Sequence, residues 1–347
     1  MRKSSTAVLL AALTLAIVPG GAKTVGNEPV VLKVATSIPR SQEAALEAKR
    51  YNDDLAALTN NAVQVRTYWG GSAGDDVDVL RKMRAGQIDG APLSLELVSR
   101  FVRQALVLAS PRMFTNYRQV DAARAELTPP MEQEAYDNGF KIMVWADIGK
   151  LRLLSKKPVA SLADFKRMRP WLYMQSETLK EFYKTIGATG VPLPLGEVYG
   201  ALQTDMIDVV WSSALLAAAL NWHAGTKYIS DRGIGFIQIA FVFRRGAWET
   251  LPKNVQDAMV KLSRDRAQEK QIEARKGDER TFQKLLQRGH IPVKTSNEAE
   301  WIEAGRALRK RMTGRIYTQE LVTQTEKLVA RYPDSATPPA ATVSVVR

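Results

Sequence analysis

The sequence contains no cysteine and only two histidines, His223 and His290, among its 347 residues. The absence of cysteine excludes disulfide bonds, thiolate metal sites and cysteine nucleophiles. Any catalytic mechanism that needs a histidine base must use one of the two imidazoles. The composition is that of a globular protein whose fold depends on apolar packing, since 45% of the residues are hydrophobic.

The chain also lacks an apolar run long enough to cross a membrane as a helix. After Arg2 and Lys3, residues 7–18 form an uncharged, mostly apolar run of 12 residues, too short to span about 30 Å of hydrocarbon. Pro19 and the small residues after it are typical of a signal-peptide cleavage region. We therefore predict a signal peptide at residues 1–22 and export of a soluble mature chain to the periplasm.

Acidic residues are fewer than basic ones, with 36 Asp and Glu against 49 Lys and Arg and a net charge of +13. Such a balance can indicate binding to nucleic acid or to an anionic membrane. Here the basic residues are spread along the chain, and residues 264–270 alternate them with acidic and amide side chains, as on a solvated helix face. Because no arginine-rich tract or aromatic ribonucleoprotein motif is present, we expect no nucleic-acid binding.

The periodicity of apolar residues predicts an α/β fold. Residues 30–36 and 63–68 are predicted strands, and residues 43–58 between them carry apolar side chains at helical spacing. This β-α-β opening favours a parallel sheet as the frame. Residues 251–287 predict a helix long enough to span two lobes.

The predicted organisation has two lobes, each built from β-α-β units. Lobe I comprises residues 28–149 plus 238–277, and lobe II comprises residues 150–237 plus 278–332. The segment 333–347, rich in Pro, Ala, Thr and Ser, is predicted to be a disordered tail.

One short motif raises an enzymatic alternative. Residues 70–74 read Gly-Gly-Ser-Ala-Gly, the G-x-S-x-G spacing that presents a nucleophilic serine, here Ser72, at a strand-to-helix turn in α/β-hydrolases. His223 or His290 would then be the base. Only about fifty mature residues precede Ser72, too few for the earlier strands and the oxyanion loop of that fold. A serine hydrolase is therefore a remote alternative, and we expect no enzyme activity.

Three aspartates follow the glycine turn, namely Asp75, Asp76 and Asp78. They lack the later ligands and the closing Glu of a calcium loop. At the start of a predicted helix they are suited to N-capping and to the positive end of the helix dipole. No Walker loop or dinucleotide fingerprint is present, so we expect neither metal nor cofactor.

Several weak motifs become specific when they occur in one order and spacing. They are the opening strand 32–35, the glycine turn 70–76 with the helix 78–84 and the segment 85–91, the segment 155–166, and the turn, strand and helix of 187–203 followed by Ile207 and Asp208. Together they resemble the solute-binding proteins of TRAP (tripartite ATP-independent periplasmic) transporters, the DctP-type family. The resemblance covers residues 30–330 and implies a two-lobed periplasmic solute-binding fold with a ligand cleft between the lobes and a long spanning helix. It also implies that Ser72 belongs to the family's glycine turn.

The resemblance implies positions for ligand-binding side chains, and this chain departs from the family there. Trp171 stands where the family has an arginine that pairs with the ligand's carboxylate. Leu151 stands at a second family arginine, and Ser212 at a family asparagine. We expect the ligand to contact Trp171, Trp211, Ser212, Leu151, Tyr173 and Arg169.

A buried carboxylate without a cationic partner loses several kcal/mol of hydration. The departures therefore favour a largely hydrophobic ligand. The alternative is a small organic acid held by displaced arginines, Arg169 or Arg152. The resemblance implies the membrane subunits of a TRAP transporter as partners, and a tetratricopeptide-repeat periplasmic protein is a further partner of some such systems. A sensory ligand-binding role stays open.

Overall fold

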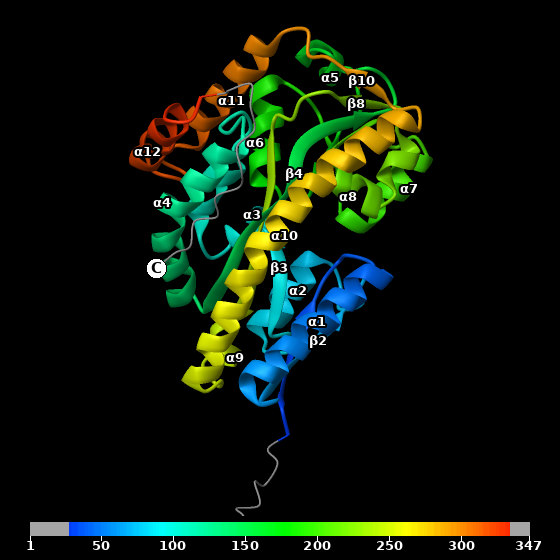
Figure 1. The fold of residues 1–347 in the computed structure, drawn as a ribbon. Coiled ribbons are helices and arrows are strands. Elements are labelled where there is room, and N and C mark those ends of the chain that lie inside the picture. The colour runs from blue at the N-terminus through cyan, green and yellow to red at the C-terminus, as the bar shows by residue number, and fades with distance from the viewer. Residues whose placement is uncertain (1–27, 334–347) are drawn as a thin grey trace, which may run out of the picture.

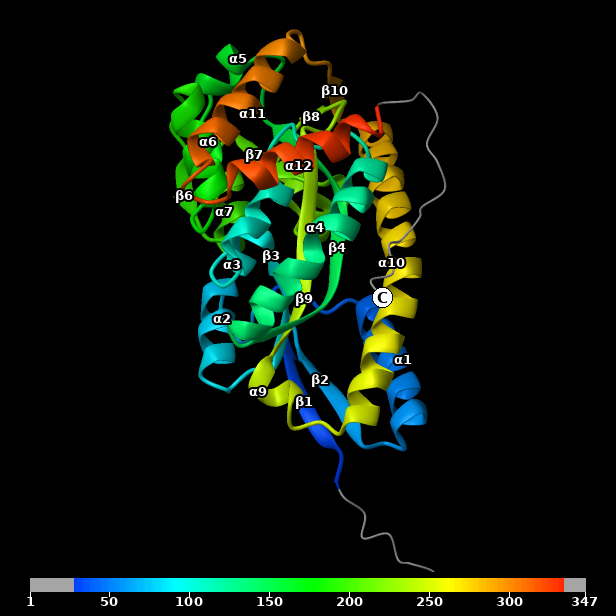
Figure 2. The same cartoon turned by 90° about the vertical axis from the view of Figure 1, so that its left-hand side faces the viewer.

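The structure is a computed structural model that describes residues 28–333. The predicted signal peptide and all of the predicted tail except residue 333 lie outside the described residues. The main sheet has eight strands in the order β10-β8-β4-β9-β3-β1-β2, and β7 pairs with β4 off this path. Figures 1 and 2 show helices on both faces of this sheet.

The strands of the main sheet are β1 (Val30–Ala35), β2 (Val63–Tyr68), β3 (Gly90–Ser94), β4 (Phe140–Ser155), β7 (Val209–Ser212), β8 (Tyr228–Ser230), β9 (Gly235–Arg244) and β10 (Ile291–Val293). A second, two-stranded sheet consists of β5 (Trp171–Tyr173) and β6 (Val191–Leu193). 

The α-helices are α1 (Gln42–Thr59), α2 (Asp76–Arg84), α3 (Leu95–Val98), α4 (Tyr117–Asp137), α5 (Leu162–Lys166), α6 (Glu177–Ile186), α7 (Val198–Gln203), α8 (Ala214–Ala219), α9 (Arg245–Trp248), α10 (Lys253–Gln287), α11 (Glu298–Met312) and α12 (Gln319–Ala330). Three 3₁₀-helices are η1 (Arg103–Ala109), η2 (Leu195–Glu197) and η3 (Trp222–Gly225). None of the helices within residues 28–333 combines the length and the hydropathy that a membrane span needs.

The main sheet is mixed, which corrects the expectation of a parallel frame. β1 pairs in parallel with β2 and β3, as the β-α-β pattern predicts. β9, however, is antiparallel to both of its neighbours, β3 and β4. The long strand β4 pairs with β9 from Phe140 to Leu151 and with β7 and β8 at its end. β4 thus passes through the predicted boundary between the lobes at residues 149 and 150, where its register with β9 shifts between Asp147 and Lys150.

The long helix α10 also connects the predicted lobes. It begins at Lys253 after Pro252 and continues for 35 residues, close to the predicted 251–287. It packs against α1 in lobe I and against α8 in lobe II, and it contacts β4 along the way. Figure 1 shows it running past both groups of helices.

The glycine turn between β2 and α2 requires glycine for its backbone. Gly70, Gly71 and Gly74 have φ angles of +62°, +75° and +100°, a region that residues with a Cβ rarely adopt. A Cβ on Gly74 would lie 2.6 Å from Cβ of Asp78. Asp75 caps α2 by accepting from the N–H of Asp78 at 2.8 Å, as the sequence predicts.

Candidate functional site

Tyr173 joins the two lobes. Its hydroxyl donates to Oδ2 of Asp76 at 3.3 Å, from β5 in lobe II to the first turn of α2 in lobe I. The other carboxylate oxygen of Asp76 accepts from the hydroxyl of Ser37 at 2.5 Å. Burial raises the pKa of the Asp76 carboxyl, although both hydrogen bonds oppose the shift. The structure thus places one expected site residue, half-buried, at the boundary between the lobes.

Glu96 makes a second contact between the lobes. Its Oε1 accepts from the hydroxyl of Ser176 at 2.7 Å, and its Oε2 accepts from the backbone N–H of Glu177 at 3.2 Å. Ser176 is the N-cap of α6, so a carboxylate from α3 in lobe I occupies the N-terminus of a helix in lobe II. Free N–H groups and the helix dipole make such a terminus a site for anions. Here the chain's own side chain fills it.

Trp171 lies in the core of lobe II. It is 4% exposed, its Nε1 donates to the backbone oxygen of Leu193 at 3.0 Å, and its ring meets that of Trp222 edge-on at 5.1 Å between centroids. Its packing and its ring N–H are thus satisfied within lobe II. Contact between Trp171 and the ligand stays a prediction, because packing within lobe II is enough to explain the burial of this side chain.

Trp211, on β7 of the main sheet, is equally buried but belongs to a different core cluster from Trp171. It is 4% exposed, and its Nε1 donates to the hydroxyl of Tyr183 at 2.7 Å. Its ring packs against Phe165, Phe182 and Trp301. The Tyr183 hydroxyl in turn donates to the backbone oxygen of Trp171 at 2.7 Å, so one tyrosine connects the two tryptophans.

Leu151 and Arg152 are neighbours on β4, and their side chains lie on opposite faces of the sheet. Leu151 is half-buried and packs against the large core cluster. Arg152 is 2% exposed and lies over the ring of Phe282 from α10, with 3.9 Å between its Cζ and the ring centroid. The two candidate positions on β4 therefore face different surroundings.

Arg152 is a buried cation whose hydrogen bonds are incomplete. Its Nη1 donates to the backbone oxygens of Ser230 and Asp231 at 3.1 and 2.6 Å, and its Nη2 lies 3.7 Å from Oε2 of Glu279. Its Nε is buried and has no partner within residues 28–333. Burial lowers the pKa of this guanidinium, although nearby carboxylates oppose the shift.

Ser212 is the residue paired with Arg152 across the β4–β7 ladder. It is 0% exposed, and its Oγ also has no hydrogen-bond partner in the described part of the chain. Buried polar atoms without partners are rare and costly in native proteins. Two such atoms thus occur at paired positions of β4 and β7.

Arg169 is placed quite differently from Arg152. Its side chain is 53% exposed, and its Nε and Nη2 donate to the two oxygens of Asp208 at 2.8 and 2.7 Å. These hydrogen bonds lower the pKa of Asp208. Because the fork of the guanidinium is already used by a carboxylate, Arg169 is not available to bind a second one in the same way.

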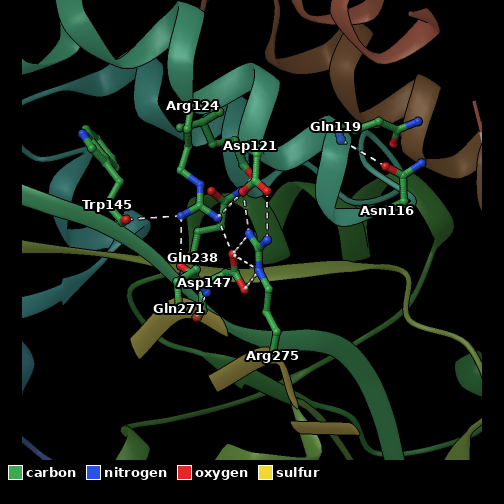
Figure 3. A network of polar contacts seen from close by, with 10 residues as sticks. Asn116, Gln119, Asp121, Arg124, Trp145, Asp147, Gln238, Gln271 and Arg275 are labelled. Atoms are coloured by element: carbon green, nitrogen blue, oxygen red, sulfur yellow. Dashed lines mark hydrogen bonds and ion pairs between the residues drawn. The ribbon is translucent and has the colours of Figure 1, made fainter. Parts of the chain in front are cut away.

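A buried ionic network lies where the chain crosses between the lobes (Figure 3). Asp147 on β4, 1% exposed, accepts from Arg124 of α4 and from Arg275 of α10, whose Nη2 lies 2.7 Å away. Arg275 also binds both carboxylate oxygens of Asp121 at 2.9 and 2.6 Å. The side-chain amide of Gln271 accepts from the backbone N–H of Asp147 and donates to its backbone oxygen. Ion pairs with the two aspartates raise the pKa of Arg275 despite its burial.

Asp278 fixes the next turn of α10 to the same crossing. Its carboxylate accepts from the backbone N–H groups of Lys150 and Leu215, both at 3.0 Å. It lies against Gly149, where φ is +114° and a Cβ would lie 2.4 Å from Cγ of Asp278. Burial raises the pKa of Asp278, and the hydrogen bonds oppose this. These charged contacts were not predicted from the sequence.

The hydrolase alternative receives no geometric support. Ser72 is exposed in the glycine turn of lobe I, whereas the rings of His223 and His290 lie 6.4 Å apart in lobe II. Nε2 of His290 lies 3.2 Å from the backbone oxygen of His223. Burial lowers the pKa of His290. Within residues 28–333, no hydrogen bond joins Ser72 to either histidine, and no group of three or more potential metal ligands is found.

Comparison with known proteins identifies the family. The family model "Bacterial extracellular solute-binding protein, family 7" (DctP) matches residues 34–315. The C4-dicarboxylate-binding periplasmic protein DctP of Vibrio cholerae is 23% identical, over 77% of this chain and 80% of that protein.

Solved structures show the same fold. A TRAP periplasmic solute-binding protein of Anaerococcus prevotii with bound D-glucuronate has a TM-score of 0.80 at 17% identity, over 88% of this chain and 100% of that one. An extracytoplasmic solute receptor of Bordetella pertussis that binds pyroglutamic acid has a TM-score of 0.78 at 17% identity, over 86% and 99%. These likenesses confirm the predicted two-lobed α/β fold with its long helix. Since the family model covers most of the chain, the protein belongs to the DctP family of bacterial extracellular solute-binding proteins.

Proposed function

We propose that this protein is the periplasmic receptor of a TRAP transporter and that its solute is a small organic acid bound between the lobes. The predicted signal peptide at residues 1–22 would direct its export, and the transporter's membrane subunits would receive the solute. Family membership supports the role of solute receptor. The likeness to proteins that bind C4-dicarboxylates, glucuronate and pyroglutamic acid supports an acidic solute.

The proposal of an acidic solute rests on two polar atoms without hydrogen-bond partners, one on Arg152 and one on Ser212. Nε of Arg152 and Oγ of Ser212 are both buried donors without partners in the described chain, at paired positions of β4 and β7. A carboxylate that accepts from both would satisfy two polar atoms and compensate a buried positive charge. We propose Arg152 as the cation that replaces the family's arginines, with Ser212 as its neighbour. Tyr173 stays a predicted contact from β5, whereas Leu151 lies on the opposite face of β4 from Arg152 and is not part of this proposed site.

Arg169, the other displaced arginine, is a weaker candidate because Asp208 already binds its fork. Asp278 lies near Arg152 and would repel an anion when ionised. Burial raises its pKa, so the repulsion weakens as the pH falls through that value. Binding of an acid at Arg152 should therefore strengthen as the pH falls, as long as the ligand itself stays ionised.

A largely hydrophobic solute is the second candidate. It is favoured by Leu151 and Trp171, which stand where the family has arginines. The burial of Trp171 and Trp211 within lobe II weakens this candidate, because their rings are already covered. If the solute is hydrophobic, we also expect a tetratricopeptide-repeat periplasmic partner.

Isothermal titration calorimetry with D-glucuronate, pyroglutamate and succinate tests the proposal. We expect at least one acid to bind, and Arg152→Gln to weaken it by about tenfold or more, since a charge-assisted hydrogen bond contributes roughly 1.5–3 kcal/mol. Arg169→Gln is the matched control and should leave binding nearly unchanged. Loss of binding in Arg169→Gln with retention in Arg152→Gln would overturn the assignment. If no acid binds but a radiolabelled fatty acid or isoprenoid does, the second candidate is favoured.

A further inference from the structure

A separate hollow of about 100 Å³ lies between α4, β4 and α10. Its apolar lining includes Met143, Val144 and Trp145 of β4 and Val260 of α10. Trp145 is half-buried, so part of its ring is available to a ligand. None of the residues proposed for the solute site lines this hollow. It is therefore a distinct place on the molecule.

Arg124 lines the hollow and is incompletely hydrogen-bonded. Its Nη1 donates to the backbone oxygen of Trp145 and to Oε1 of Gln271, both at 3.2 Å, and its Nη2 binds Asp147 (Figure 3). Its Nε, by contrast, has no hydrogen-bond partner in the described chain. This atom is buried, and the residue as a whole is only 9% exposed. A buried donor without a partner calls for an acceptor that the chain does not supply.

The charged residues that line the hollow are more basic than acidic. Lys141 and Arg264 line it, and neither has an ion pair within residues 28–333. Two carboxylates also line it: Asp121, which binds Arg275, and Glu132, whose Oε1 accepts from Nε1 of Trp145 at 2.9 Å. Burial raises the pKa of Glu132, although the Trp145 hydrogen bond and the charges of Lys141 and Arg264 oppose the shift. The balance of charge attracts an anion.

We propose that this hollow is a second ligand site that takes a compact aromatic carboxylic acid. The aromatic ring would pack on Trp145 and the neighbouring aliphatic side chains. The carboxylate would lie toward Lys141 and Arg264, on the wall that Arg124 also lines. The hollow has only about 100 Å³ and is open to solvent, which limits the ligand to a single ring whose polar end projects toward the opening. The site does not depend on the solute bound between the lobes.

Benzoate is the probe, with benzamide as its uncharged analogue. Titration calorimetry of the mature protein should show one saturable site for benzoate in the millimolar range or tighter, and weaker binding of benzamide. The double variant Lys141→Gln/Arg264→Gln should weaken benzoate binding by about tenfold, as expected for the loss of two partly exposed charges. Glu132→Gln should strengthen it, because it removes the opposing charge and keeps an oxygen acceptor for Trp145.

Two controls place the binding at this hollow. Lys253→Gln/Lys261→Gln removes two charges from exposed positions of the same helix and should leave the affinity unchanged. Arg152→Gln alters the solute site and should also leave it unchanged. The absence of saturable benzoate binding to the unaltered protein would overturn the inference. So would binding that disappears in Arg152→Gln but persists in the Lys141→Gln/Arg264→Gln variant.

Discussion

The carboxylate of Glu96 in lobe I accepts a hydrogen bond from Ser176, the N-cap of α6 in lobe II, at 2.7 Å. Because the next residue's N–H also donates to Glu96, an acidic side chain of one lobe stabilises the end of a helix in the other. This contact and the Tyr173–Asp76 hydrogen bond are formed between lobes that are expected to close on a solute. Both carboxyl groups have raised pKa values because of burial.

The first prediction concerns pH. Burial raises the pKa of Glu96 in the folded protein above its usual 4.5, so the folded protein binds this proton more tightly than the unfolded chain does. The stabilisation that results from proton binding is fully present below the unfolded pKa and is lost as the pH rises through the folded pKa. Relative to Glu96→Gln, the wild-type protein should therefore gain melting temperature as the pH falls from neutral to about 4.5.

Thermal unfolding at a series of pH values measures this difference. Glu320→Gln on the exposed face of α12 is the control, and its curve should run parallel to that of the wild type. Parallel curves for Glu96→Gln as well would show that the raised pKa has no role in stability.

The second prediction concerns the network at Asp147. Arg275→Ala should destabilise the protein by about 3–5 kcal/mol, because it leaves the buried carboxylate of Asp147 and the half-buried carboxylate of Asp121 short of a cationic partner. Lys253→Ala, which breaks the exposed pair with Asp257 on the same helix, should change stability little. Urea unfolding monitored by circular dichroism would measure both. Equal effects of the two substitutions would contradict the importance of the buried network.

The third prediction concerns the glycine turn. Gly74→Ala should cost roughly 1–3 kcal/mol, since alanine must adopt a φ that only glycine tolerates well and its Cβ would meet Asp78. Gly200→Ala in α7, where a Cβ would meet nothing within 4 Å, should stabilise the protein by about 0.5–1 kcal/mol. The same unfolding assay compares the two. A neutral Gly74→Ala would mean that the turn relaxes without cost.

The fourth prediction separates core packing from ligand contact at the tryptophans. Tyr183→Phe removes the acceptor of Nε1 of Trp211 and a donor to the backbone of Trp171. We expect a loss of about 1–3 kcal/mol of stability from the unsatisfied indole and an unchanged affinity for solute. If affinity falls while stability is kept, Trp171 and Trp211 serve the ligand after all.

The sequence was most informative where its pattern is periodic and local. The apolar spacing of Val255, Met259 and Leu262 predicts α10 nearly to its ends, and the glycine turn with Asp75 predicts the start of α2. No sequence pattern predicts β9, and the alternating burial of residues 235–244 is a property of the folded structure. Its antiparallel position makes the sheet mixed, and that depends on pairing between segments far apart in the chain.

The charged crossing could not be predicted, because apolar periodicity indicates which face of a helix is buried but does not identify the partners of its polar residues. Gln271, Arg275 and Asp278 continue the same buried face of α10 that Phe282 and Leu285 occupy. Polar residues at such positions signal buried partners on other elements. Which partners they meet depends on tertiary contacts, as the pairing of Arg275 with Asp147 shows. The family resemblance predicts Trp171 as a ligand residue. Its burial depends on packing against Trp222, a tertiary contact that the resemblance does not reveal.

The central claim is that Arg152 holds an acidic solute. Native mass spectrometry of the mature protein purified from its own periplasm, with extraction and identification of any bound molecule, tests it most directly. We predict a small carboxylic acid that is present in the wild-type protein and absent from Arg152→Gln purified in the same way. A bound neutral lipid in both proteins would contradict the claim and would favour the hydrophobic solute.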